Sequence, residues 1–316
     1  MTGEIEVLSA CGAATPTKLL KYCTLHDQVA GSMFAATRRR LYFVLAVLAV
    51  YTVRSMLPRS PPSTPYTSQF GQDRWLADNM FYGEAYDGTK RRTAAPMQRA
   101  LTFVEFGARD GWVDSNTWYF ESERGWRGVC AEPMQSDYVR LVTNRPRCAS
   151  VMGAIGPKAG LREFAMVRQD RGWGPLRWES SSGSTGWNGF VDTMSDGQIA
   201  NLWKMALHSG RSKYRLRFES IMVQCYKLED LLEKAKIENV SYMSIDCEGC
   251  ETEFLTAFDF GRFRVDVLQL EGDGYEKLLA KHGYRLLKSA SWAALGHHDS
   301  LYLHKSFRPS ANPALR

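Results

Sequence analysis

Short runs of β-branched and aromatic residues alternate with stretches of helical periodicity from residue 66 to about residue 308. This alternation is typical of an α/β fold built on a largely parallel sheet with helices between the strands. Helices are predicted over residues 228–236 and 251–258, and residues 215–223 alternate like one more strand. The predicted strands of the sheet are 101–106, 128–132, 150–155, 242–246, 265–270, 284–288 and 300–304.

An apolar run over residues 41–53 precedes this region and follows three arginines, residues 38–40. Thirteen helical residues rise only about 20 Å against a hydrocarbon core of about 30 Å, so a span must extend to Leu57 or let the flanking arginines snorkel. We predict an uncleaved membrane anchor over residues 38–57. A cleaved signal peptide and a buried helix of the soluble fold are the competing interpretations. Arginines on the N-terminal side favour a cytosolic N-terminus, which puts the following domain in the lumen of the endoplasmic reticulum or Golgi.

Four prolines within residues 58–65 indicate an extended, semi-rigid linker. A second irregular stretch, residues 170–190, is rich in Gly, Ser and Trp and is predicted to be a long loop. The expected organisation is therefore a cytosolic tail, a membrane anchor, a linker, a catalytic domain and a C-terminal tail. These parts are residues 1–37, 38–57, 58–65, 66–308 and 309–316.

The composition, 44% hydrophobic and 12% aromatic over 316 residues, is sufficient for one sizeable core. Basic residues that are scattered along the chain give a net charge of +6, so nucleic-acid binding is not indicated. The seven cysteines are an odd number, which leaves at least one free or paired with another chain.

The segment FVEFGARDG, residues 103–111, is an apolar strand with the acid Glu105, followed by a turn in which Gly107 and Gly111 are four residues apart. Glycines let backbone approach a ligand closely, and ligands of an open parallel sheet lie beyond the carboxyl ends of its strands. This turn is therefore a candidate nucleotide-type cofactor site. An ordinary tight turn is the competing interpretation.

A second strand ends at Glu132, 21 residues past Gly111, and Pro133 stops the strand directly after it. A carboxylate at this place can accept hydrogen bonds from both hydroxyls of a ribose. Enzymes that use NAD normally show three glycines in the order G-x-G-x-x-G, and this turn does not. S-adenosylmethionine fits the looser turn better.

Three acids, Asp246, Glu248 and Glu251, crowd the end of another predicted strand. Like charges this close are unfavourable unless they bind something or point apart. Glu251 has an alternative role at the start of the following helix. Asp246 and Glu248 are candidates for orienting a cofactor, holding an acceptor hydroxyl, acting as general base or binding a divalent cation.

Five segments occur in the order found in the FkbM methyltransferase family, which the chain resembles over roughly residues 66–305. They are SQFGQD at 68–73, FVEFGARDG at 103–111, DSNT at 114–117, GVCAEP at 128–133 and SIDCEGCE at 244–251. The eukaryotic, membrane-anchored branch, which includes the Star-like proteins, looks most similar.

This resemblance implies a Rossmann-like class I methyltransferase fold, with a mostly parallel seven-stranded sheet and helices on both faces. It implies S-adenosylmethionine as cofactor and a hydroxyl of a sugar, glycan or small metabolite as acceptor. The implied catalytic pair that faces the acceptor is Asp246 and Glu248, and no metal ligand is assigned. The implied cofactor-binding residues are Glu105, Gly107, Ala108, Gly111, Asn116, Glu132 and Pro133.

A second class of function stays open, because the Star-like resemblance and the anchor also suit a non-catalytic, membrane-anchored trafficking protein that binds cargo. The Cys247–Cys250 spacing resembles half of a metal site, but no second pair or nearby histidine completes it. Packing is the expected role of these two cysteines.

Overall fold

The computed structural model describes residues 64–82, 101–171, 188–200, 214–291 and 298–309. Two compact units divide the chain, residues 1–57 and 58–316, and every described residue belongs to the second. The predicted N-terminal tail, the anchor, most of the linker and nearly all of the C-terminal tail lie outside the described residues. Among the described helices, none has the length and apolar character needed to cross a bilayer.

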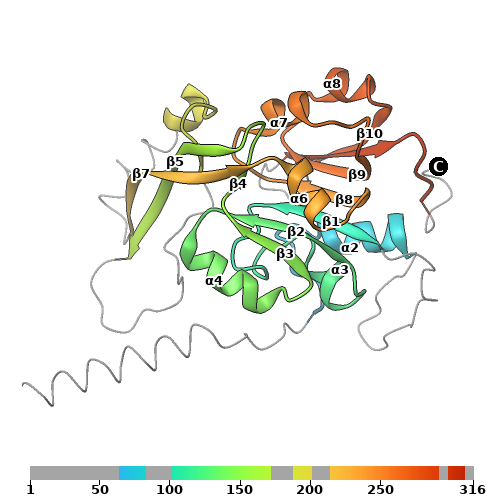
Figure 1. Ribbon diagram of the computed structural model, residues 1–316, viewed down its shortest axis with the longest axis horizontal. Helices are drawn as coiled ribbons and strands as arrows, with labels where there is room; N and C mark the ends of the chain where they lie inside the picture. Colours follow the sequence, from blue (N-terminus) through green and yellow to red (C-terminus); the bar gives the residue numbers. More distant parts are fainter. Residues whose placement is uncertain (1–63, 83–100, 172–187, 201–213, 292–297, 310–316) are drawn as a thin grey trace, which may run out of the picture. The chain divides into compact units, whose positions relative to one another are not determined.

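A seven-stranded sheet in the order β10-β11-β9-β8-β1-β2-β3 forms the centre of the described region (Figure 1). Strand β11 runs antiparallel to both of its neighbours, and the other neighbouring pairs are parallel. The predicted mixed α/β fold with a mostly parallel seven-stranded sheet is therefore confirmed. The strands are β1 Thr102–Phe106, β2 Arg127–Glu132, β3 Cys148–Met152, β8 Asn239–Ile245, β9 Arg264–Glu271, β10 Tyr284–Ser291 and β11 His298–His304.

Both faces of this sheet are covered by helices, because alternate residues of its strands are buried in two different apolar clusters. Val104 and Met243 pack with the helices α6, α7 and α8, whereas Phe103 and Tyr242 pack with α2, η1, α3 and α4. The two helices predicted at 228–236 and 251–258 are α6 and α7. The helices are α2 Gln72–Leu76, the π-helical η1 Ala77–Phe81, α3 Trp118–Ser122, α4 Gln135–Asn144, α6 Leu228–Lys234, α7 Glu251–Ala257 and α8 Glu276–Ala280.

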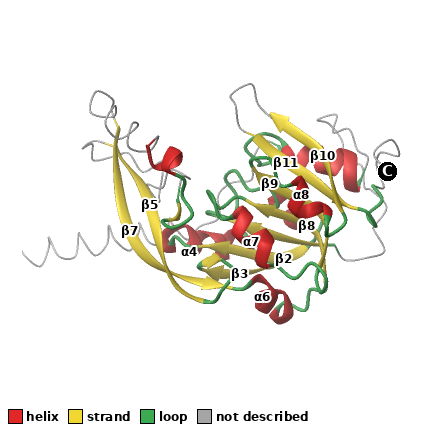
Figure 2. Ribbon diagram, turned by 90° about the horizontal axis from the view of Figure 1, so that it is seen from above, coloured by secondary structure: helices red, strands yellow, loops and turns green. Residues whose placement is uncertain are grey.

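A second sheet, in the order β4-β7-β5-β6, is an addition that the sequence predicted only in part. Its members are β4 Ala154–Ile155, β5 Gly160–Arg171, β6 Gly189–Phe190 and β7 Tyr214–Tyr226. Strand β7 contains the extra strand expected at 215–223. Figure 2 shows β5 and β7 side by side over their full length, as their antiparallel register requires.

Two sequence predictions are corrected by this sheet. The predicted strand 150–155 is two strands of different sheets, separated at Gly153, where a side-chain Cβ would lie 2.2 Å from the carbonyl oxygen of Gln224. The predicted loop 170–190 was wrong at both ends, because β5 continues to Arg171 and β6 begins at Gly189. The residues between them, 172–187, lie outside the described residues.

A disulfide joins Cys130 of β2 to Cys148 of β3 and so ties the edge strand β3 to its neighbour. Cys225 is buried with a free thiol. This free thiol agrees with the expectation that an odd number of cysteines leaves at least one unpaired within the chain. Two of the seven, Cys11 and Cys23, lie outside the described residues.

Candidate active site

A cavity of about 360 Å³ lies at the carboxyl ends of the parallel strands of the large sheet. Phe106, Glu132, Ile245 and Glu271, the last residues of β1, β2, β8 and β9, line it. The small sheet contributes Phe164 and Phe190, among others, to the wall of the same cavity. Parallel strands direct their carboxyl ends to one edge of a sheet, which is why segments far apart in the sequence meet here.

The glycine turn after β1 lies directly against the end of β8. Gly107 has a φ of +67°, and a Cβ at this position would lie 2.8 Å from the carbonyl oxygen of Asp246. Ala108 is buried and donates its backbone N–H to Ala131, at 3.0 Å. Of the residues predicted to bind the cofactor, Ala108 and Gly111 are not in the cavity lining, because they form the inner side of this turn.

Glu132 lies at the end of β2 with its carboxylate buried against the glycine turn. Its Oε2 accepts a hydrogen bond from the backbone N–H of Arg109, and its Oε1 accepts one from Met134, each at 2.8 Å. Burial raises the pKa of Glu132 to about 8, although these two backbone donors lower it. Each oxygen keeps one lone pair for a ligand in the cavity, and Pro133 lines the cavity beside it.

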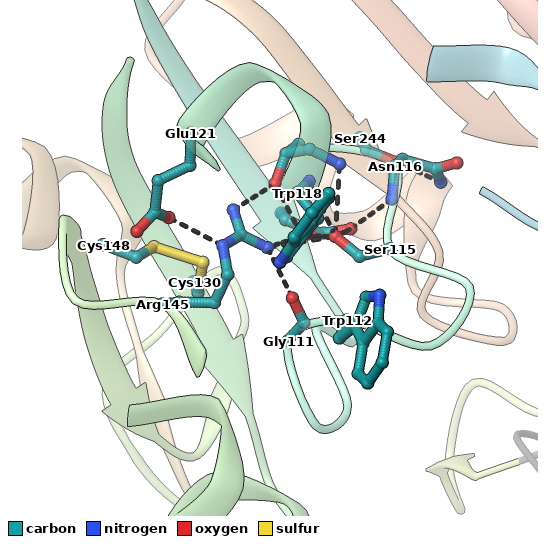
Figure 3. Close-up of polar contacts among 12 residues, drawn as sticks. Gly111, Trp112, Ser115, Asn116, Trp118, Glu121, Cys130, Arg145, Cys148 and Ser244 are labelled. Carbon is teal, nitrogen blue, oxygen red and sulfur yellow. Dashed lines mark hydrogen bonds and ion pairs between the residues drawn. A yellow bond between two sulfur atoms is a disulfide. The ribbon is translucent and has the colours of Figure 1, made fainter. Parts of the chain in front are cut away.

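Glu105 also contributes to the cavity lining, but its carboxylate is fully engaged by the protein. It accepts hydrogen bonds from the hydroxyls of Ser115 and Thr117, from the backbone N–H of Asn116 and from the guanidinium of Arg145. Figure 3 shows how Arg145 reaches this loop from the interior. Glu105 therefore organises the loop 111–117 rather than offering free oxygens to a ligand.

The side-chain amide of Asn116 is only partly hydrogen-bonded within the part of the chain that the structure describes. Its Nδ2 donates to the Ser244 hydroxyl at 3.0 Å, while its Oδ1 is buried and has no hydrogen-bond partner among the described residues. A buried polar atom without a partner is unfavourable, and Asn116 lines the cavity. Its Oδ1 is therefore a candidate contact for a ligand that donates a hydrogen bond.

Beside the glycine turn, at the ends of β8 and β9, the carboxylates of Asp246, Glu248 and Glu271 gather within 4.8 Å of one another. Enclosure by the cavity walls and then repulsion among neighbouring carboxylates raise the pKa of all three. Asp246 is the most exposed of the three. Carboxylate oxygens at this spacing have the chemistry to hold a divalent cation or to receive hydrogen bonds from hydroxyl groups.

Four acids that line this cavity were not assigned to the site from the sequence: Asp114, Asp137, Glu271 and Asp299. Glu271 is the last residue of β9, so the rule that found Glu132 would have found it had the predicted strand not stopped at residue 270. Asp299 lies near the amino end of β11, opposite Glu271 in the antiparallel register. The side-chain amides of Gln72 and Gln269 donate to it at 2.9 and 2.8 Å. A search restricted to the carboxyl ends of strands does not find it.

The loop that carries Glu248 is closed by a disulfide between Cys247 and Cys250. Packing was the expected role of this pair; Cys250 is indeed buried, and the covalent link is an addition. Backbone N–H groups of Cys247 and Gly249 donate to the carboxylate of Glu251, which begins α7 as predicted. Glu248 is held with a φ of +55°, a strained conformation for a residue with a side chain.

The model of the family described as "Methyltransferase FkbM domain" matches residues 105–286, more than half of the chain. The chain belongs to the FkbM methyltransferase family. The matched region of this FkbM methyltransferase contains Glu105, the glycine turn, Glu132, Asp246 and Glu248, and it includes the small sheet. No curated protein shows significant similarity to the chain. The predicted Star-like branch stays a prediction, because the match identifies the family as a whole.

Substitution of Gly107 is expected to destabilise the fold more than substitution of a glycine that has a similar positive φ but no close neighbour. Gly125 has a similar φ of +72° with nothing within 4 Å of an added Cβ, so Gly125→Ala isolates the backbone effect. We expect a loss in the free energy of unfolding of about 1 kcal/mol for Gly125→Ala and about 2–4 kcal/mol for Gly107→Ala. Urea denaturation measures both values, and equal losses would contradict the close approach to Asp246.

Because the pKa of Glu132 is raised, the effect of Glu132→Gln on the thermal stability of the fold should depend on pH. Between about 4.5 and about 8, the folded wild type binds more protons than the unfolded chain, so its stability falls as the pH rises. Gln does not titrate. In the absence of ligand, the Tm of the variant relative to that of the wild type should therefore increase by about 10 °C across this range. A Tm difference that does not change with pH would contradict the burial of an ionisable Glu132.

Proposed function

We propose that this FkbM-family methyltransferase uses S-adenosylmethionine and methylates a hydroxyl oxygen of a sugar, glycan or small metabolite. One observation carries the proposal. The same cavity holds the buried, strand-terminal Glu132 on one side of the glycine turn and the group Asp246, Glu248 and Glu271 on the other. A cofactor and an acceptor thus each have a suitable wall. The seven-stranded order with one antiparallel strand supports the class I methyltransferase fold.

The residues present fit the chemistry of S-adenosylmethionine. The open lone pairs of Glu132 suit the two ribose hydroxyls, and Ala154 and Ile155 offer an apolar wall for an adenine ring. The unpartnered Oδ1 of Asn116 suits the ammonium group of the methionine part. Gly107, without a side chain, leaves the backbone of the turn open to close approach.

When bound, S-adenosylmethionine would supply an electrophilic methyl group on a positively charged sulfur. Asp246 and Glu248 would orient the acceptor hydroxyl and accept its proton. Their raised pKa values suit this role, because a carboxylate with increased proton affinity is a better general base near neutral pH. Most of the rate gain would come from positioning the hydroxyl in this enclosed cavity.

We also propose that this domain works in an oxidising compartment, such as the lumen of the endoplasmic reticulum or Golgi, with residues 38–57 as its membrane anchor. Two disulfides within one domain support this location, since the cytosol keeps thiols reduced. The acceptor would then be a luminal molecule that carries hydroxyl groups.

Calorimetric titration of S-adenosylmethionine into the purified full chain, with NAD as comparison ligand, tests the cofactor. We expect the wild type to bind S-adenosylmethionine and not NAD. Glu132→Ala should weaken binding at least about tenfold, because two ribose hydroxyls lose their acceptor. Asp246→Asn should still bind but transfer no methyl group to a panel of hydroxylated sugars.

The matched control is Glu163→Ala, which removes a carboxylate of β5 that does not line the cavity. This variant should bind S-adenosylmethionine like the wild type. A folded wild type that does not bind S-adenosylmethionine would contradict the proposal and favour the cargo-binding role of the Star type.

Alkylation of the full chain in intact cells tests the compartment. If the domain folds in an oxidising lumen, mass spectrometry without reduction should recover peptides linked through Cys130–Cys148 and through Cys247–Cys250. Recovery of all four cysteines as alkylated free thiols would place the domain in a reducing compartment and exclude the luminal assignment.

A further inference from the structure

The geometry points to Arg145 as a positioning residue for the cofactor, acting from the interior through Glu105, Gly111 and Asn116. This inference rests on the proposed function, because it assigns Arg145 a part in binding S-adenosylmethionine. Arg145 follows α4 in the sequence and belongs to none of the segments that carry the family resemblance. Its side chain is 1% exposed and does not line the cavity, so it cannot contact a ligand directly.

The guanidinium of Arg145 lies between two buried carboxylates. Its Nε donates to Glu121 Oε2 at 2.6 Å, and its Nη1 donates to Glu105 Oε2 at 3.1 Å. A buried carboxylate needs both a counter-charge and hydrogen-bond donors, and only a planar guanidinium provides donors in several fixed directions at once. Lysine would keep the charge but lose this geometry.

These donors divide into an outer and an inner set. The outer contact, to Glu121, leads away from the cavity, because Glu121 is not in the cavity lining and also accepts the backbone N–H of Arg147. The inner contacts all go to β1 and the loop after it. Beyond Glu105, they are the carbonyl oxygen of Gly111 at 3.2 Å and the hydroxyls of Ser115 and Thr117 at 3.0 and 2.6 Å (Figure 3).

Through this inner set, Arg145 controls where Asn116 lies. The backbone N–H of Asn116 donates to Glu105 Oε1 at 2.7 Å, and Glu105 is itself fixed by Arg145 and by two hydroxyls that Arg145 also contacts. The unpartnered Oδ1 of Asn116 therefore takes its position from a chain of hydrogen bonds that starts at a residue outside the cavity. Displacement of the guanidinium would displace the cofactor contact.

The same residue explains the second glycine of the turn. Gly111 has a φ of +80°, and an added Cβ would lie 2.6 Å from Cγ of Arg145 and 2.7 Å from Cδ1 of Leu141. Gly111 thus makes room for the stem of Arg145, whereas Gly107 faces the cavity. The two glycines of one motif have different partners, and only the first can meet a ligand.

Arg145→Lys and Glu121→Gln, made in the full chain, separate positioning from simple stabilisation. Both should lower the Tm, because each disturbs the same buried ion-pair group. Calorimetry with S-adenosylmethionine should show a Kd raised about tenfold to a hundredfold for Arg145→Lys, and within about threefold of wild type for Glu121→Gln. Thr117→Val, which removes one hydroxyl of the inner set, should raise the Kd by about three- to tenfold.

Each outcome either supports or contradicts the positioning role of Arg145. If folded Arg145→Lys binds S-adenosylmethionine like the wild type, or if all variants weaken binding in proportion to their loss in Tm, the positioning role is overturned. If Arg145→Lys does not fold, the comparison of Thr117→Val with Glu121→Gln gives the same test. Failure of the wild type to bind would overturn the proposed function instead.

Discussion

Arg145, the residue that follows α4, joins two other stretches of the chain through its buried guanidinium: β1 with the loop that follows it, and helix α3. A guanidinium and two carboxylates in a dry interior are stable only if nearly every donor and acceptor is satisfied. Here the hydroxyls of Ser115 and Thr117 complete the arrangement. The loop after β1 and the wall of the cavity that it forms therefore depend on an ion-pair group whose arginine does not line the cavity.

The acids at the ends of β8 and β9 are not neutralised by a buried ion pair of this kind within the described part of the chain. Asp246, Glu248 and Glu271 lie close together, and although Arg109 lines the same cavity and lowers the pKa of Asp246, burial and the neighbouring carboxylates outweigh it. Such a group raises the pKa of each member and disfavours the folded state at high pH. Active sites commonly carry this kind of local instability, because the same carboxylates are suited to hold a reacting hydroxyl and take its proton. The wall at the glycine turn thus rests on a buried, hydrogen-bonded ion-pair group, whereas the wall at the ends of β8 and β9 gathers acids whose pKa values are raised.

Each of the two walls of the cavity has its own disulfide nearby. Cys130–Cys148 links β2 to β3 behind Glu132, and Cys247–Cys250 closes the loop that presents Glu248. The small sheet forms a further boundary, since Gly249 lies close to Thr193 just after β6, where an added Cβ would be 3.0 Å from the carbonyl oxygen. The wall that carries Glu248 is therefore built from a covalently closed loop that packs against the small sheet.

Local patterns in the sequence were sufficient for most of the large sheet and for several residues of the cavity. Apolar runs of the right length predict the central strands β1, β2, β8 and β9, because burial on both faces leaves a continuous apolar signal. The partly exposed edge strand β3 was instead merged with β4. Glu132 and Asp246 could be identified for the same reason, as acids that directly follow such runs. Family-type segments then correctly indicated the FkbM domain.

Contacts between distant segments were decided only by the tertiary structure. Arg145 resembles any helix-terminal arginine in the sequence, and its role exists only because α4 returns to β1. Asp299 enters the cavity because β11 runs antiparallel, and β4 separates from β3 because β7 passes close to Gly153. Strand periodicity depends on neighbours in the sequence, whereas ion pairs, disulfides and strand order depend on which segments fold against each other. The sequence by itself therefore determined most strands of the large sheet and the family, and the tertiary structure determined the small sheet, what supports the glycine turn and which acids share the cavity.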